Sequence, residues 1–144
     1  MRGRPDQAAY QRGAVDVTTS AALERVIARA QNDPAVLAVI LFGSQARGEA
    51  VSASDIDVCL VLDRGVPSGL PASRKRLDYL AEGGLDLSIF QQLPLPVRSR
   101  ILREGKVLFV RDEDRFYQVA VRTARAFEGF RHHYRNYLDA VERD

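Results

Sequence analysis

The sequence predicts an α/β (α+β) domain with a small mixed sheet of three to four strands, helices packed against it, and a long C-terminal helix. Short apolar segments recur at residues 36–42, 56–62 and 85–90, which is typical of buried strands. Segments with apolar residues at helical spacing lie between and around them. The chain then ends in one long segment with the same helical spacing.

Length, charge and cysteine content narrow the class of protein. The 144 residues suit one domain with a sizeable core, expected at residues 18–144, behind a polar and flexible N-terminal arm at residues 1–17. The net charge of +2 is too small to predict a nucleic-acid or membrane surface. The single cysteine, Cys59, excludes an internal disulfide and suits a reducing cytosol. No apolar stretch approaches the length of a membrane span, so we expect a cytoplasmic protein.

The first predicted elements are a helix and a fully buried strand. Thr19 or Ser20 can cap the helix, and it should end before Pro34, because the residue ahead of a proline is disfavoured in a helix. The strand at residues 36–42 is apolar almost throughout, so both of its faces should be covered. The inward face of the helix is expected to carry Leu23, Val26, Ile27 and Ala30.

The middle of the chain predicts a crossover between two parallel strands. A loop rich in glycine and proline follows the strand at residues 56–62. A short helix at residues 72–81 should then turn Leu77 and Leu80 inward, and a third strand follows at residues 85–90. A helix between two strands favours parallel pairing, because antiparallel neighbours need only a short turn.

The last third of the chain predicts two helices and an edge strand. Pro94 and Pro96 should open one helix that stops at Gly105, and residues 107–110 form a short edge strand. The final helix is expected at residues 114–142, and the roughly 26 residues of its apolar seam span about 39 Å, whereas a small domain is roughly 30 Å across, so its aromatic end should overhang. Its predicted apolar seam is Phe116, Ala120, Thr123, Phe127, Phe130, Tyr134, Tyr137 and Val141.

The most informative stretch joins the first two strands. Gly43 and Ser44 form a small-residue turn directly after the first strand, and ten residues separate Ser44 from Asp55. Asp55 and Asp57 are two residues apart on a strand, so both carboxylates face the same side. Two hard oxygen ligands on one face suit Mg²⁺ bound together with substrate phosphates. The turn and Arg47 offer backbone N–H groups and a guanidinium to those phosphates.

The motif Gly43-Ser44, ten residues, Asp55-x-Asp57 resembles the signature of the DNA polymerase beta-like nucleotidyltransferase superfamily. The longer segments GSQARG and SDIDVCLVLD resemble the minimal nucleotidyltransferases of prokaryotes, small proteins often paired with a HEPN-domain toxin. The likeness covers the chain from about Ala21 onward. It implies a polymerase beta palm-like fold, one or two Mg²⁺ ions, and ATP as substrate, with Ser54 beside the acids as a further nucleotide-binding candidate.

A third carboxylate is expected from the strand at residues 85–90. Leu85, Leu87 and Ile89 alternate with Asp86, which leaves Asp86 on the polar face near the start of its strand. The resemblance implies that a carboxylate on this neighbouring strand completes the metal site and accepts the proton of the incoming hydroxyl. Three close carboxylates repel one another, so they need a cation between them. A solvated Asp86 on a half-exposed strand is the alternative.

The function predicted from these features is Mg²⁺-dependent transfer of AMP from ATP to a hydroxyl. The resemblance implies a tyrosine of a cognate HEPN toxin as acceptor, which makes this chain the antitoxin of a type VII-like pair. We expect the partner to contact the C-terminal helix, because aromatic residues are enriched in interface cores. Two alternatives stay open: an antitoxin that acts by binding alone, and an aminoglycoside-type small-molecule nucleotidyltransferase. The contact residues expected on this helix are Phe127, Phe130, Tyr134 and Tyr137.

Overall fold

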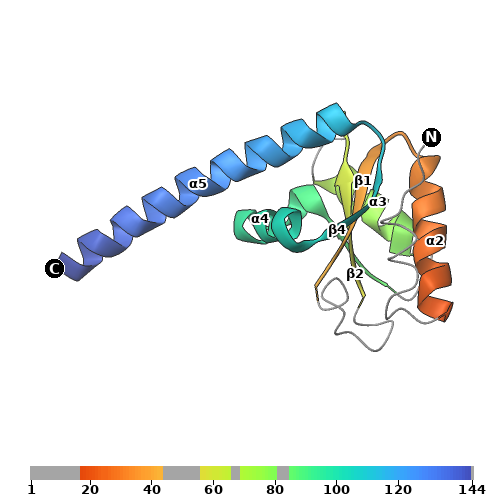
Figure 1. Ribbon diagram of the computed structural model, residues 1–144, viewed down its shortest axis with the longest axis horizontal. Coiled ribbons are helices and arrows are strands. Elements are labelled where there is room, and N and C mark those ends of the chain that lie inside the picture. The colour runs from red at the N-terminus through yellow and green to blue at the C-terminus, as the bar shows by residue number, and fades with distance from the viewer. Residues whose placement is uncertain (1–16, 44–55, 66–68, 81–84, 144) are drawn as a thin grey trace.

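The computed structural model describes most of the chain, and the expected mixed sheet lies at its centre (Figure 1). The predicted N-terminal arm lies outside the described residues, apart from Val17, which begins the first helix. None of the described helices is long and apolar enough to cross a membrane. The described residues are 17–43, 56–65, 69–80 and 85–143.

The sheet has four strands in the order β3-β2-β1-β4. The central strands are β1, Val36–Phe42, and β2, Asp57–Leu62, which pair antiparallel. The crossover predicted after β2 is confirmed, because β3, Asp86–Ile89, pairs with β2 in parallel. The predicted edge strand is also confirmed as β4, Lys106–Val110, which lies antiparallel to β1.

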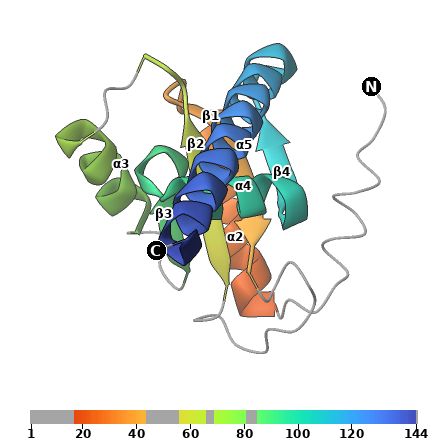
Figure 2. The ribbon, with the colours of Figure 1, turned by 90° about the vertical axis from the view of Figure 1, so that its left-hand side faces the viewer.

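Helices cover both faces of the sheet (Figures 1 and 2). On one face lie α2, Val17–Gln31, and α3, Leu70–Leu80. On the other face lie α4, Leu95–Glu104, and α5, Glu113–Arg143, and α5 passes in front of α4 in Figure 2. A short 3-10 helix, η2, at Phe90–Gln92 joins β3 to α4.

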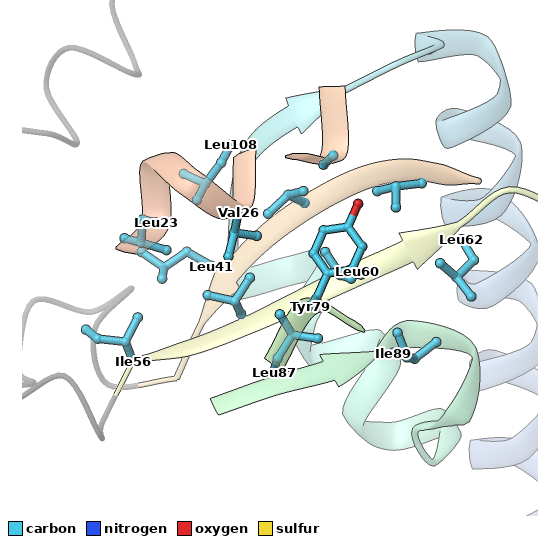
Figure 3. Close-up of a cluster of buried hydrophobic side chains, with 14 of the residues drawn as sticks. Leu23, Val26, Leu41, Ile56, Leu60, Leu62, Tyr79, Leu87, Ile89 and Leu108 are labelled. Carbon is cyan, nitrogen blue, oxygen red and sulfur yellow. The ribbon is translucent and has the colours of Figure 1, made fainter. Parts of the chain in front are cut away.

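Two cores, one on each face, follow from the alternation of side chains along the strands. The core under α2 and α3 takes the even-numbered residues of β2, together with Leu87 and Ile89 of β3 (Figure 3). The core under α4 and α5 takes Cys59 and Val61 from β2. Both faces of β1 are therefore buried, as the uniformly apolar sequence of this strand predicts.

Three local predictions need correction. The helix α2 begins at Val17, so Thr19 and Ser20 lie inside it and neither precedes it as a cap. Leu77 does not point inward; it is 63% exposed, and Tyr79 is buried in its place. Tyr79 shares its helix face with Ala72, seven residues earlier, and its hydroxyl donates a hydrogen bond to Asp33 at 2.9 Å. Burial of the Tyr79 ring in the core and this part-buried hydrogen bond both favour the observed rotation of α3.

The third correction concerns the strand predicted at residues 85–90, which ends at Ile89 and continues as η2. Phe90 nevertheless packs on the α4 side, as its place in the alternation predicts. The long final helix is confirmed at 31 residues, about 46 Å. Its distal part runs beyond the sheet (Figure 1), where Phe130 is 44% and Leu138 40% exposed. The side chains of Tyr134, Tyr137 and Val141 lie outside the described part of the chain.

Candidate functional site

Two of the predicted acids lie side by side at one end of the sheet. Asp57 begins β2, Asp86 begins β3, and the two residues are direct partners in the parallel register. The amide of Asp86 donates a hydrogen bond to the carbonyl of Ile56 at 2.9 Å, which fixes that register. Val58 and Leu87, the next residues, both enter the α2–α3 core. Asp57 and Asp86 therefore both face the α4–α5 side of the sheet.

Gly43 lies against the carboxylate of Asp57. Phe42, the last residue of β1, pairs with Asp57, so Gly43 begins the next segment at the same end of the sheet. Its φ angle is +81°, a conformation that disfavours any residue with a Cβ. A Cβ at this position would overlap Oδ2 of Asp57 and lie 3.2 Å from its Cγ. Glycine is needed here both for the backbone and for the space that the carboxylate occupies.

The close neighbour of Gly43 is a side chain, the carboxylate of Asp57. The sequence around Gly43 does not reveal this neighbour. The glycine and the acid are separated in the chain by the long connection between β1 and β2. Antiparallel pairing of Phe42 with Asp57 brings them together. Gly43 and the second acid of the motif are thus neighbours in the fold.

The remaining motif residues, Ser44, Arg47, Ser54 and Asp55, lie outside the described residues, and their roles stay predictions. Within the described ranges, no group of three or more His, Cys, Asp or Glu side chains is arranged to hold a metal ion. The described donors are the carboxylates of Asp57, which is half-buried, and Asp86, which is exposed. Hard anionic oxygens of this kind suit Mg²⁺, which needs few protein ligands when phosphates supply the others.

The open edge of β3 is held beside Asp86 by an arginine from α3. Nε of Arg76 donates a hydrogen bond to the carbonyl oxygen of Leu87 at 2.8 Å. Since Asp86 is bonded to β2 through its own amide, the carbonyl of Leu87 points away from β2, toward the edge. Arg76 therefore satisfies a backbone acceptor at the residue next to Asp86 and ties α3 to the strand that carries this acid.

A polar network lies where α2 joins β1 and is structural. Asp33 accepts hydrogen bonds from Nζ of Lys75 at 3.0 Å, from the hydroxyl of Tyr79 and from the amide of Ala35. Burial of Asp33 opposes its ionisation, but these hydrogen bonds outweigh burial and hold the pKa of the carboxyl below its usual value. The guanidinium of Arg111 donates to the carbonyls at the end of α2, including that of Ala30.

Cys59 belongs to the core and not to the site. Its side chain is fully buried in the α4–α5 core, and burial raises the pKa of its thiol far above the usual value. A thiol held neutral and enclosed is a poor nucleophile and a poor metal ligand. Cys59 therefore acts as a small buried apolar residue.

The sequence missed a groove between α4 and α5. The apolar seam of α5 was predicted, but the contribution of α4 to the groove was not. The sequence of each helix alone does not indicate which other helix it packs against. The groove has a volume of about 660 Å³ and opens on the side of the sheet that Asp57 and Asp86 face. A second hollow of about 330 Å³ continues along the distal part of α5.

Comparison with known proteins agrees with the fold. Residues 24–114 match the family described as Polymerase beta, Nucleotidyltransferase. The chain belongs to this family. The match contains all three described parts of the site, namely Gly43, Asp57 and Asp86, and it ends at the first residues of α5. The distal part of α5 lies outside the matched region.

One curated relative is similar in sequence. The protein named "Putative protein adenylyltransferase" of Methanocaldococcus jannaschii is 36% identical over 77 residues. That alignment covers 51% of this chain and 56% of the relative, so the chain spans a little over half of the relative's length.

Solved structures resemble the whole fold. One chain from a toxin-antitoxin crystal structure with AMP-PNP has a TM-score of 0.62 at 20% identity, covering 82% of this chain and 97% of that one. Another comes from a complex of a tri-AMPylated Shewanella oneidensis HEPN toxin with an MNT antitoxin. Its TM-score is 0.58 at 15% identity, covering 94% of this chain and 98% of that one. At these identities the likeness concerns the fold.

Proposed function

We propose that this nucleotidyltransferase-family chain transfers AMP from ATP to a hydroxyl group of a partner protein, in a reaction that depends on Mg²⁺. The observation that carries the proposal is the row formed by Gly43, Asp57 and Asp86 at one end of the sheet. The carboxylates lie on adjacent strands, face the same side, and sit beside a glycine with a positive φ angle. The name of the Methanocaldococcus jannaschii relative supports adenylyl transfer in particular.

Each residue of the site has a role in the proposed reaction. The acceptor oxygen forms a bond to the α-phosphorus of ATP while the bond from that phosphorus to the bridging oxygen breaks, releasing pyrophosphate. Asp86 accepts the hydroxyl proton, the role that the family resemblance implies for a carboxylate on the strand next to Asp57. Asp57, Asp86 and Asp55 would hold magnesium, which neutralises charge on the triphosphate and the leaving group when bound. Ser44, Arg47 and Ser54 would hold the phosphates.

We propose a HEPN-domain toxin as the protein partner and a tyrosine hydroxyl as the acceptor. The support is the likeness of the fold to a chain in the complex of the AMPylated HEPN toxin with its MNT antitoxin. The distal part of α5 offers a surface for such a partner, because it carries exposed apolar residues beyond the sheet. The pair would act in the cytoplasm, with contacts at Phe127, Phe130, Tyr134 and Tyr137.

The test is transfer of label from α-³²P-ATP to a purified HEPN partner. Asp57→Asn should abolish labelling, because the substitution removes a charge that metal and phosphate binding require. Asp78→Asn is the matched control, since Asp78 is exposed on α3, which packs on the sheet face opposite to the one that Asp57 faces. Labelling by the Asp57→Asn variant at the wild-type rate would refute the proposed catalytic role.

A second candidate function, neutralisation by binding alone, is favoured by one observation. Phe130 and Leu138 are exposed on the distal part of α5, and a partner can bind these apolar side chains whether or not the site is catalytically active. An Asp57→Asn variant that is unable to label the partner but still neutralises the toxin at equal dose would support this function.

A further inference from the structure

We propose that the groove between α4 and α5 binds an acidic amphipathic helix of the protein that is modified. This inference rests on the proposed function and deepens it, because it states where the acceptor protein docks and what chemistry its docking segment carries. The groove has an apolar floor and a positively charged rim, and it lies on the same side of the sheet as Asp57 and Asp86.

The floor of the groove is apolar and suits a helix. Leu102 of α4 faces Ala120, Ala124 and Phe127 of α5 across the groove. The two alanines lie one turn apart, so their small side chains leave room for another helix to approach closely. The second hollow extends this surface along α5 past Phe127, whose ring stacks on that of Phe130 at 6.1 Å between centroids.

The rim of the groove is positively charged. Arg103 contributes from α4, and Arg131 and Arg135 contribute from α5. The only acidic residue that lines the two described hollows is Glu128, and Arg131 already pairs with it at 3.4 Å. A segment with glutamates or aspartates beside its apolar stripe would therefore complement the groove in charge as well as in polarity.

Charge also argues against the other possible occupants. A second copy of this chain seated with the same groove would bring Arg131 and Arg135 toward their own counterparts, and like charges repel. A single-stranded nucleic acid would match the arginines, but it binds on exposed aromatic platforms. Here the floor is made by a leucine and two alanines, with Phe127 half-buried between the helices.

The groove and the acids lie on the same side of the sheet. The α4–α5 core contains Ile40 and Cys59. Asp57 lies two residues before Cys59 on the same strand, so its side chain points to the same side of the sheet. Figures 1 and 2 show α4 and α5 together on one side, with α5 extending outward from it. A protein docked in the groove therefore sits on the face of the sheet that the carboxylates occupy, where its hydroxyl could meet a bound nucleotide.

The test uses two stapled helical peptides with the same leucine stripe, one flanked by glutamates and one by lysines. Binding to the full chain is measured by fluorescence anisotropy without ATP, so the outcome does not depend on catalysis. The glutamate peptide should bind at least ten-fold more tightly than the lysine peptide. Arg135→Glu should weaken binding of the glutamate peptide about ten-fold.

Arg122→Glu is the matched control, because it makes the same charge change at an exposed site on the opposite face of α5. It should leave binding of the glutamate peptide within two-fold of wild type. Equal binding of the two peptides, absence of binding, or an equal effect of the two substitutions would overturn the proposal. So would tighter, Arg135-dependent binding of a single-stranded oligouridylate. None of these results bears on whether Asp57→Asn abolishes transfer, so the two proposals can fail separately.

Discussion

Replacing Gly43 with alanine tests whether this glycine shapes the site or only the turn. Gly43 and Gly69 both have positive φ angles, +81° and +89°, so alanine should strain both backbones by about 1–2 kcal/mol. Only at Gly43 does the new Cβ meet another group, the carboxylate of Asp57; at Gly69 nothing lies within 4 Å. Gly69→Ala therefore isolates the backbone cost.

The expected effects follow from the position of the added carbon. To regain van der Waals contact, the Asp57 carboxylate must move by roughly 1 Å, and a displacement of that size can cost about 100-fold in a positioned reaction. Both variants should lose about 1–2 kcal/mol in free energy of unfolding, measured by urea titration. Only Gly43→Ala should lose label transfer, by about 100-fold, and weaken MgATP binding at least ten-fold, measured by calorimetry.

The comparison of the two variants can refute this reasoning directly. If Gly43→Ala and Gly69→Ala bind MgATP and transfer label equally well, then contact between Gly43 and Asp57 does not hold the carboxylate in its working position. A much larger loss of stability in Gly43→Ala would instead show that the carboxylate cannot move aside and that the clash is met by the backbone.

Three further predictions concern charge and stability. Asp86→Asn should abolish transfer yet raise the metal-free unfolding free energy by about 0.2–1 kcal/mol, because it relieves repulsion from Asp57 on the adjacent strand; a loss of stability in urea titrations would contradict this. Asp33→Asn should cost about 1–2 kcal/mol at pH 7. Because folding lowers the pKa of Asp33, its ionised carboxylate stabilises the folded state fully only above the pKa of the unfolded chain, near 3.9. This stabilisation is lost as the pH falls through the lower pKa of the folded state, so the unfolding free energies of wild type and variant should converge in acid. A difference that persists at pH 2 would count against the ionised network. Gly129→Ala should stabilise the distal part of α5 by about 1 kcal/mol, because alanine favours the helix and nothing lies within 4 Å of the new carbon. Amide hydrogen exchange there should slow accordingly, and unchanged exchange would show that other contacts hold this part of the helix.

Much of the fold could be predicted because the strands are short, apolar and separated by clear turns. The uniformly apolar β1 and the alternating β3 revealed which faces are buried, and the crossover before β3 indicated parallel pairing. The placement of Asp86 beside Asp57 follows from those two inferences together. The roles assigned to these acids in catalysis and metal binding stay predictions.

What could not be predicted depends on contacts between distant segments. Leu77 and Tyr79 are both apolar candidates for the inward face of α3, and Tyr79 is the buried one, with its hydroxyl bonded to Asp33, which is distant in the sequence. Predicting the groove also requires knowing how α4 packs against α5, because both helices contribute residues to its floor. The proximity of Gly43 to the Asp57 side chain depends on the register of β1 with β2, which neither strand specifies alone.

The most direct test of the central claim is nuclear magnetic resonance with Mn²⁺ in place of Mg²⁺, in the presence of AMP-PNP. Signals of Gly43, Asp57 and Asp86 should broaden selectively at substoichiometric Mn²⁺, whereas those of Asp63, at the opposite end of β2, and Gly69 should not. The broadening should disappear in Asp57→Asn. Broadening that is centred elsewhere, or that survives this substitution, would contradict a metal and nucleotide site at this end of the sheet.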